Sequence, residues 1–347
     1  MLPRSTSNDS FLVIRLSSLG DVLLTTPALR CLRKTYPQSH IDVIVRERYV
    51  ELLRGNPNIS SVIPLPEPAD RKTIRNVAET MESRYDTVID LHTGFRSTYL
   101  RRLLKPERAL IYHKRRLVRW LKVRLKLDLY GDEFSVPLAY LKCLQPLNVK
   151  DDNLGMEWQG ALLQKDQFLE KAKLAYPSEV PTIALCPGAS FASKRWPVEN
   201  WCSLAAELLK ENFNLWIIGD NSDKTAGDQI RSVNPEHINN FCGLLSFAQS
   251  GAALSLCNLA ITHDAGPSHM AAAVKTPLVA IFGSTVLQFG FRPFRIPHRI
   301  AEVNVTCRPC SHLGFDRCPK DHFRCMKDIT SEHVLQLVKD LLSDISQ

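Results

Sequence analysis

Short apolar runs alternate along the first 150 residues with longer segments of helical spacing. The runs at 11–16, 41–45 and 87–90 predict buried strands, and Val62-Ile63 predicts a shorter one. A helix after the first run is predicted by its spaced apolar residues, Val22, Leu23, Pro27, Leu29 and Leu32, and by Pro37, before which it ends. This alternation is typical of a parallel sheet with helices on both faces.

A second alternating pattern begins at Thr182, after a less regular stretch that holds several prolines. Apolar runs at 182–186, 215–218, 259–262 and 277–283 predict strands. A helix is predicted from Trp196, with a proline at a favourable early position. The pattern therefore predicts a second sheet of the same α/β class.

We accordingly expect two doubly wound domains in tandem, with an interdomain cleft between their carboxyl edges. The predicted limits are a disordered tail at 1–10, a first domain at 11–165, a second at 166–330 and a final helix at 331–347. A chain of 347 residues suits two domains of ordinary size.

Composition places the chain among globular proteins, with 44% hydrophobic and 23% charged residues. No apolar run approaches the roughly 18–20 residues that cross a bilayer, and residues 1–10 lack the apolar middle of a signal peptide. We therefore expect a cytoplasmic protein whose ten cysteines are mostly reduced thiols.

The strongest chemical signal lies at residues 262–273, where Asp264, Gly266 and His269 stand between an apolar strand and an alanine-rich helix. A helix that begins at the rim of a sheet offers free N–H groups and the positive end of its dipole. Anions such as a diphosphate bind at such sites, which favours a nucleotide or another phosphorylated ligand.

Two other strand ends carry polar residues of the same character. Ser190 and Lys194 follow the run at 182–186, and they could bind a diphosphate or simply lie in a solvated loop. Asp223 follows the run at 215–218, where an acid could accept hydrogen bonds from ribose or form an ordinary turn.

Near the N-terminus, Ser18-Leu19-Gly20-Asp21 follows the first predicted strand. Asp21 could be the N-cap of the next helix, because Asp is among the best residues at that position. It could also be a general base that takes a proton from an acceptor hydroxyl.

Positive charge is concentrated between Arg96 and Lys126, where there are twelve Lys or Arg residues and one acid, Glu107. The whole chain has a formal charge of +8, so the net positive charge of this window is larger than that of the entire chain. At 117–126 apolar and basic residues are interleaved as on an amphipathic helix that binds an anionic membrane or phosphorylated glycolipid. A solvated face and a nucleic-acid patch are the alternatives.

Four cysteines, Cys307, Cys310, Cys318 and Cys325, lie close together near the C-terminus. Four thiols at this spacing could hold structural zinc. Free thiols or redox pairing are the alternatives, so we predict no cofactor from this segment.

Taken together, these motifs resemble those of the lipopolysaccharide heptosyltransferases of glycosyltransferase family 9. The resemblance runs from Phe11 to about Val338, and it is carried by the motifs at 18–22, 187–197 and 264–269. It implies a glycosyltransferase-B fold, with the acceptor on the first domain and the sugar nucleotide on the second. The final helix would pack back toward the first domain.

The resemblance also implies an inverting, metal-independent transfer of heptose from ADP-heptose to the lipopolysaccharide inner core, most like the second heptosyltransferase. Asp21 matches the catalytic base. The expected nucleotide-sugar contacts are Ser190, Lys194, Asp223, Leu245 (on the adenine), Asp264, Ala265 (through its N–H), Gly266 and His269. Arg96, Arg101 and Arg119 are expected to bind the phosphorylated lipid A–inner core acceptor.

The implied location is the cytoplasmic face of the inner membrane, with peripheral contact and no nucleic acid partner. A family 9 enzyme with another donor sugar or glycan acceptor is one alternative. A non-catalytic protein that binds nucleic acid or another anion is the second. A dehydrogenase is disfavoured, because the first strand is not followed by GxGxxG.

Overall fold

The computed structural model describes residues 9–81, 84–131, 134–174 and 179–346. Its contacts divide the chain into two compact units, one of residues 1–115 and 136–160 and one of residues 116–135 and 161–347. Residues 1–8 of the predicted tail lie outside the described residues, whereas Ser10 already belongs to the first strand. The predicted domain limits stay predictions.

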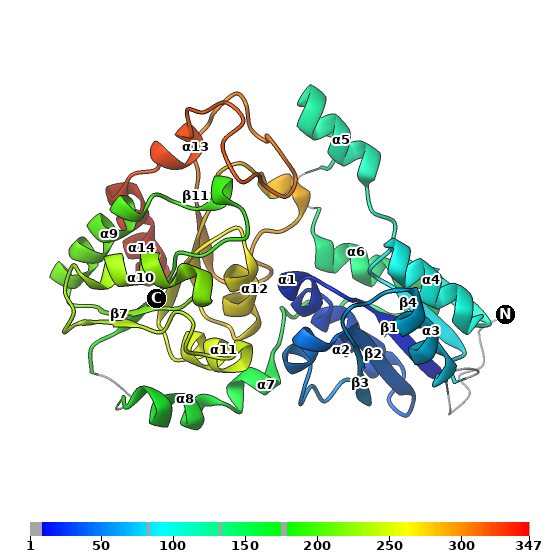
Figure 1. The fold of residues 1–347 in the computed structure, drawn as a ribbon. Helices are drawn as coiled ribbons and strands as arrows, with labels where there is room; N and C mark the ends of the chain where they lie inside the picture. The colour runs from blue at the N-terminus through cyan, green and yellow to red at the C-terminus, as the bar shows by residue number, and fades with distance from the viewer. Residues whose placement is uncertain (1–8, 82–83, 132–133, 175–178, 347) are drawn as a thin grey trace. The chain divides into compact units, whose positions relative to one another are not determined.

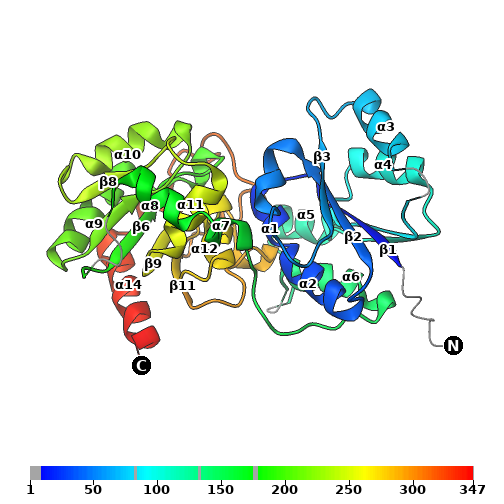
Figure 2. The ribbon, with the colours of Figure 1, turned by 90° about the horizontal axis from the view of Figure 1, so that it is seen from below.

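The first unit is a five-stranded parallel sheet in the order β3-β2-β1-β4-β5. Its strands are β1 (Ser10–Ile14), β2 (His40–Arg46), β3 (Ser61–Leu65), β4 (Thr87–Asp90) and β5 (Arg108–Ile111). Its helices include α1 (Leu19–Leu23), α2 (Thr26–Thr35), α3 (Arg71–Glu79), α4 (Phe95–Leu104) and α6 (Val136–Cys143). In Figure 2, α3 and α4 lie on one side of the sheet and α2 and α6 on the other.

The helix predicted after the first strand is interrupted, because Pro27 has no N–H to donate to the Leu23 carbonyl and instead stands in the first turn of α2. The hydroxyl of Thr25 donates to the Val22 carbonyl (2.7 Å) and that of Thr26 to the Leu23 carbonyl (2.9 Å). These local bonds compete with the helical pattern. The prediction of one continuous helix was therefore wrong, although α2 ends just before Pro37 as expected.

The second unit is a six-stranded parallel sheet in the order β11-β10-β9-β6-β7-β8. Its strands are β6 (Thr182–Cys186), β7 (Asn214–Ile217), β8 (Ile238–Asn240), β9 (Leu259–His263), β10 (Leu278–Ile281) and β11 (His298–Ala301). Every residue of β6, β9 and β10 is buried, which explains why these strands have continuous apolar sequences. Renumbered within this unit, the strand order is that of a dinucleotide-binding fold.

Helices cover both faces of the second sheet (Figure 1). They are α8 (Lys165–Ala172), α9 (Val198–Lys210), α10 (Lys224–Arg231), α11 (Phe247–Ser255), α12 (Gly266–Ala273), α13 (Arg324–Lys327) and α14 (Ser331–Ser346). The final helix, α14, packs on α9 and β11 through Val334, Val338 and Leu341. Its expected approach to the first domain stays a prediction.

Three further elements complete the description. Helix α5 (Arg116–Leu125) is grouped with the second unit, and α7 (Gln159–Leu162) lies where the two units join in sequence. The longest 3₁₀ turn, η1, spans Glu47–Leu52. Within the described part of the chain, no helix has both the length and the apolar character needed to cross a bilayer.

Candidate active site

Asp21 lies beyond the carboxyl end of β1, in the first turn of α1. Its Oδ1 is 2.6 Å from a guanidinium nitrogen of Arg15, and its Oδ2 accepts a hydrogen bond from the Ser18 hydroxyl (2.8 Å). The N-cap is Ser18 and not Asp21, because the helix begins at Leu19. The side chain of Asp21 is 22% exposed, so a substrate hydroxyl can reach the carboxylate.

Arg15 is the buried partner that fixes this carboxylate. One of its nitrogens donates to the Leu91 carbonyl (2.7 Å) and to the Tyr140 hydroxyl (2.6 Å). Burial lowers the pKa of Arg15, but the charge and hydrogen bond of Asp21, with Tyr140 and Tyr112, together raise it by more, so the guanidinium stays protonated. Sequence reasoning missed Arg15, although a single cation inside the apolar run at 11–16 is an unusual feature.

His92 was also missed, and it follows β4 at the same edge of the sheet. Burial, together with the positive charges of Arg15 and Lys114, lowers its pKa to about 4, so the imidazole is neutral near pH 7. Its Nδ1 is buried and makes no hydrogen bond to any residue that the structure describes. The Asp90 carboxylate accepts from the N–H groups of His92 and Thr93, which holds the loop in place. The edge therefore carries a neutral base beside the Arg15–Asp21 pair.

The three arginines expected to bind the acceptor do not lie in one unit. Arg96 and Arg101 are both on α4, where Arg96 donates to the Ala69 carbonyl (2.7 Å) and Arg101 lies 3.6 Å from Asp90. Arg119 is on α5, which is grouped with the second unit. Helix α4 thus presents two cations beyond the carboxyl end of β4.

In the second unit, Lys194 and Asp264 form a buried ion pair beside the start of α12. Lys194 Nζ is 2.7 Å from Asp264 Oδ2 and 2.9 Å from the Asp264 carbonyl, and the Thr285 hydroxyl donates to the same Oδ2 (2.6 Å). Burial raises the pKa of Asp264, but the Lys194 ammonium and the Thr285 hydroxyl lower it by more, so the carboxyl is ionised. A cation is thereby fixed next to a helix N-terminus.

The first residues of α12 differ in part from expectation. Ala265, the N-cap, donates its N–H to the His263 carbonyl (2.8 Å), so this group closes a turn and does not point to a free ligand site. Gly266 supplies the first N–H of the helix. His269 is buried, and its ring centre lies 6.2 Å from that of Phe291.

His263 connects this loop to the one that carries Lys194. Its Nε2 accepts from the Trp196 N–H (2.8 Å), and its Nδ1 is 3.3 Å from the Gly188 carbonyl. The proton is therefore on Nδ1, because Nε2 acts as the acceptor. Burial lowers the pKa of His263 to about 4. This neutral histidine positions the 187–196 loop.

Asp223 packs against two glycines at the ends of β6 and β7. A Cβ on Gly188 would lie only 2.6 Å from Asp223 Cγ, and one on Gly219 would lie 2.8 Å from Asp223 Cβ. Burial and the charge of Asp220 raise the pKa of Asp223. Ser190, in the adjoining loop, is exposed. The structure thus brings the ends of β6, β7 and β9 together at one edge, with the expected donor contacts around them.

Leu245 lines a hollow of about 390 Å³ with Phe241 and Leu244. Ala172, two amides (Asn239 and Asn240) and two cations (Lys171 and Arg231) complete the lining. The N–H of Gly243 donates to the Gly219 carbonyl (3.1 Å), which fixes this loop to the end of β7.

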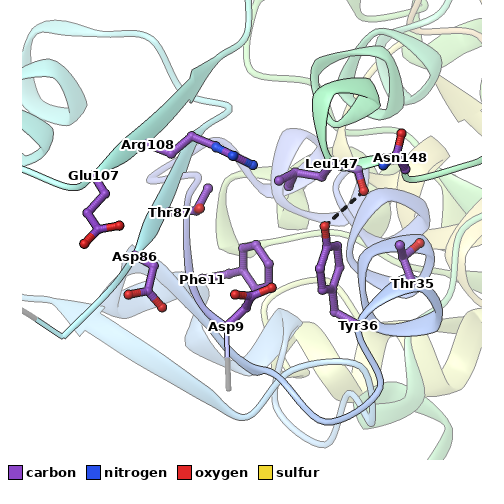
Figure 3. Close-up of a pocket in the computed structure, with 10 residues that line it drawn as sticks. All are labelled: Asp9, Phe11, Thr35, Tyr36, Asp86, Thr87, Glu107, Arg108, Leu147 and Asn148. Carbon is purple, nitrogen blue, oxygen red and sulfur yellow. Dashed lines mark hydrogen bonds between the residues drawn. The ribbon is translucent and has the colours of Figure 1, made fainter. Parts of the chain in front are cut away.

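A different hollow, of about 380 Å³, lies in the first unit (Figure 3). It is at the amino edge of the sheet, opposite the carboxyl edge that carries Asp21. Asp9, Asp86 and Glu107 contribute carboxylates there, and Arg108 contributes a single cation. This hollow opens at the amino ends of β1, β4 and β5, away from Asp21. Its acidic lining does not suit a phosphorylated ligand.

Among the four clustered cysteines, Cys307 Sγ lies 3.7 Å from His322 Nε2, and Cys310 Sγ donates to the Cys307 carbonyl (3.3 Å). Among the described residues, a set of metal-ligating atoms within 4.8 Å of one another occurs at Cys31, Asp151 and Asp152, and not at these thiols. Asp152 is already paired with Arg30 and Lys34. Zinc, free thiols and redox pairing at the four cysteines stay predictions.

Comparison with known proteins gives consistent matches over most of the chain. The model of glycosyltransferase family 9 (heptosyltransferase) matches residues 74–314, more than half of the sequence. Lipopolysaccharide heptosyltransferase 2 of Salmonella typhimurium is 28% identical, and the match covers 96% of this chain and 98% of that protein.

Two solved structures share the fold over 97% of this chain. They are ADP-heptose lps heptosyltransferase II of E. coli (TM-score 0.74, 23% identity, all of that chain covered) and a glycosyl transferase family 9 protein of Veillonella parvula (TM-score 0.76, 22% identity, 97% of that chain covered). The predicted α/β fold of glycosyltransferase-B type, with two doubly wound units, is thus confirmed.

Proposed function

The chain belongs to glycosyltransferase family 9, the heptosyltransferases, and on that premise we propose that it transfers heptose from ADP-heptose with inversion and without a metal. Heptose transfer to the lipopolysaccharide core is the activity that the family and the heptosyltransferase 2 relatives support. Within that activity, we assign the second transfer, onto an inner core that already carries one heptose.

The donor site is proposed at the carboxyl edge of the second sheet. The observation that carries this proposal is the buried Lys194–Asp264 pair beside the N-terminus of α12. A diphosphate there would meet the Lys194 ammonium, the Gly266 N–H and the positive end of the helix dipole. Ser190 would donate its exposed hydroxyl, and Asp223 would accept from the ribose.

These groups also serve the chemical step, because ADP gains negative charge as it departs. Lys194 and the helix N-terminus are held in place before the reaction by Asp264, Thr285 and His263. A preorganised contact of this kind typically contributes about 3–4 kcal/mol to transition-state stabilisation. We propose that this stabilisation operates without a divalent cation at the diphosphate.

Asp21 is the proposed general base. The acceptor oxygen forms a bond to the anomeric carbon while the bond from that carbon to the β-phosphate oxygen breaks. The hydroxyl proton passes to Asp21, and ADP leaves with the electron pair, so the configuration at the anomeric carbon inverts. Arg15 and Ser18 occupy part of the carboxylate's acceptor capacity and leave room for the incoming hydroxyl.

The acceptor is proposed to be the phosphorylated inner core on lipid A, which is anchored in a membrane. Arg96 and Arg101 on α4 would bind its phosphates. An enzyme with such an acceptor must work at a membrane surface, and we propose peripheral contact with the cytoplasmic face of the inner membrane.

The test is mass-spectrometric detection of transfer from ADP-heptose to inner-core acceptors that carry zero or one heptose, in the presence of a chelator. One added heptose on the acceptor that already has one supports the donor, the acceptor and the transfer without a metal. Addition only to the acceptor without heptose reassigns the step. Transfer from another nucleotide sugar instead of ADP-heptose contradicts the donor, and oligonucleotide binding without any transfer contradicts the enzyme.

A further inference from the structure

Helix α5 presents an apolar face to solvent. None of its side chains is buried, and Leu117, Trp120 and Leu125 are 69%, 53% and 55% exposed. At 100° per residue these three side chains and that of Leu121 fall on one side of the helix. Exposed apolar surface of this extent on a helix usually marks an interaction site.

The same helix is strongly basic. Seven Lys or Arg residues lie between Lys114 and Lys126, and no acidic residue interrupts them. Arg116, Arg119 and Lys122 fall on the side opposite the apolar face. Lys122 is paired with Asp128 at 2.6 Å, after the end of the helix. The helix therefore combines an apolar face with a positive face, which suits an anionic lipid surface.

The residues that follow α5 are held to the rest of the second unit by hydrogen bonds and a ring contact. Lys126 Nζ donates to the carbonyls of Cys307 (2.9 Å) and Pro309 (2.7 Å). Tyr130 is buried, and its ring centre lies 5.9 Å from that of Phe289. Two more exposed leucines, Leu127 and Leu129, lie between these anchors.

We propose that α5 and residues 126–131 dock the enzyme on an anionic bilayer. The apolar side chains of Leu117, Trp120 and Leu125 enter the boundary between headgroups and acyl chains, and the arginines and lysines bind lipid phosphates. This deepens the proposed function, because it names the surface through which the enzyme reaches a lipid-anchored acceptor.

Trp120 provides a direct test. The chain has five tryptophans, and the other four are at most 5% exposed. We expect a blue shift of emission, and quenching by brominated acyl chains, with vesicles of 70% phosphatidylcholine and 30% phosphatidylglycerol. Both signals should weaken at high salt, because the attraction is partly electrostatic. The Trp120→Phe variant should lose both signals and still co-float with the vesicles.

Substitutions on the apolar face of α5 distinguish specific docking from nonspecific adsorption of exposed leucines to vesicles. Leu117→Ser with Leu125→Ser should weaken co-flotation at least tenfold. Leu154→Ser with Leu163→Ser, at leucines that are 52% and 65% exposed elsewhere, should change it less than twofold. Equal losses in the two double variants would overturn the proposal. So would the absence of a Trp120 signal with anionic vesicles, or a signal with a short RNA and none with vesicles.

A water-soluble, deacylated acceptor distinguishes a failure of membrane docking from a failure of the proposed transferase activity. Transfer to that acceptor should be the same in the wild type and in Leu117→Ser/Leu125→Ser, while transfer to acceptor in vesicles falls in the variant. If the variant lost both transfers equally while it remained folded, α5 would not be a docking element. If the wild type transferred to neither, the proposed function would fail, whereas vesicle binding would still be decided by Trp120.

Discussion

Arg15 binds the carboxylate of Asp21 with a nitrogen–oxygen distance of 2.6 Å, and it does so from a buried position. Its other contacts, to the Leu91 carbonyl and the Tyr140 hydroxyl, prevent the guanidinium from turning away. The orientation of the proposed base therefore depends on residues from three separate parts of the first unit.

Tyr140→Phe tests whether this network matters for the reaction. Loss of the hydroxyl 2.6 Å from Arg15 should destabilise the protein by about 1–2 kcal/mol and lower kcat several-fold, with KM for the donor unchanged. Tyr36→Phe is the matched control, because it removes one hydroxyl bond to the Leu147 carbonyl at the other edge of the sheet. Steady-state kinetics and urea unfolding supply the two readouts. Equal kcat in both variants would show that the network is only structural.

Lys194→Met should lower both stability and activity. Asp264 would be left as a buried charge without its partner, at a cost of about 3 kcal/mol or more. Adding Asp264→Asn should restore much of the stability, since Asn can still accept from Thr285. Activity should stay about 10²–10³-fold low, because the cation at the diphosphate is missing. Recovery of activity in the double variant would exclude Lys194 from the chemical step.

The lowered pKa of His263 predicts that the second unit becomes less stable as the pH falls below neutrality. Its pKa is lowered to about 4 in the folded protein, against about 6.5 in the unfolded chain. Its contribution is therefore fully present above pH 6.5 and is lost as the pH falls toward 4. Between pH 7 and pH 5 the free energy of unfolding should fall by about 2 kcal/mol from this residue.

His263→Gln should remove about 2 kcal/mol of the fall between pH 7 and pH 5 and leave the contribution of His92, whose pKa is also lowered to about 4. The exposed His237→Gln should leave the profile unchanged. Urea titrations at several pH values, followed by tryptophan fluorescence, measure the slope. A His263→Gln profile as steep as that of the wild type would assign the effect to other groups.

Gly188→Ala should weaken nucleotide binding, because its Cβ would displace Asp223. We expect the dissociation constant for ADP to rise about tenfold or more, by roughly the worth of a charge-assisted hydrogen bond. Gly160→Ala is the control, since its Cβ would clash with the Arg54 carbonyl in the first unit, away from the proposed donor site. Calorimetric titration with ADP distinguishes the two, and an unchanged affinity in Gly188→Ala would argue against a ribose role for Asp223.

Much of the fold could be predicted because parallel strands that are buried on both faces have continuous apolar sequences. β6 and β9 were placed correctly for this reason, within a residue. The break between α1 and α2 was not predicted from periodicity, although Pro27 marks it, because proline has no N–H for the backbone bond that a continuous helix needs. Membership of α5 in one unit or the other depends on long-range contacts such as those of Lys126.

The candidate site was predictable where its residues follow strands in sequence motifs, as Lys194 and Asp264 do. Arg15 and His92 were missed because their roles depend on which way a side chain points inside the sheet edge. The same applies to Ala265, whose N–H is used within its own turn. Local sequence identifies such positions but not the partners that their groups have in the folded chain.

The most direct test of the account is the rate of heptose transfer by Asp21→Asn at saturating ADP-heptose and acceptor. Asn keeps an oxygen that can accept from Ser18 but cannot take the hydroxyl proton. Arg15 loses its carboxylate partner and keeps its bonds to the Leu91 carbonyl and the Tyr140 hydroxyl, so we expect lower stability in a chain that still folds. The account predicts a fall of about 10²–10⁴-fold in kcat, with ADP binding and circular dichroism unchanged. A folded Asp21→Asn enzyme that transfers heptose at the wild-type rate would contradict it.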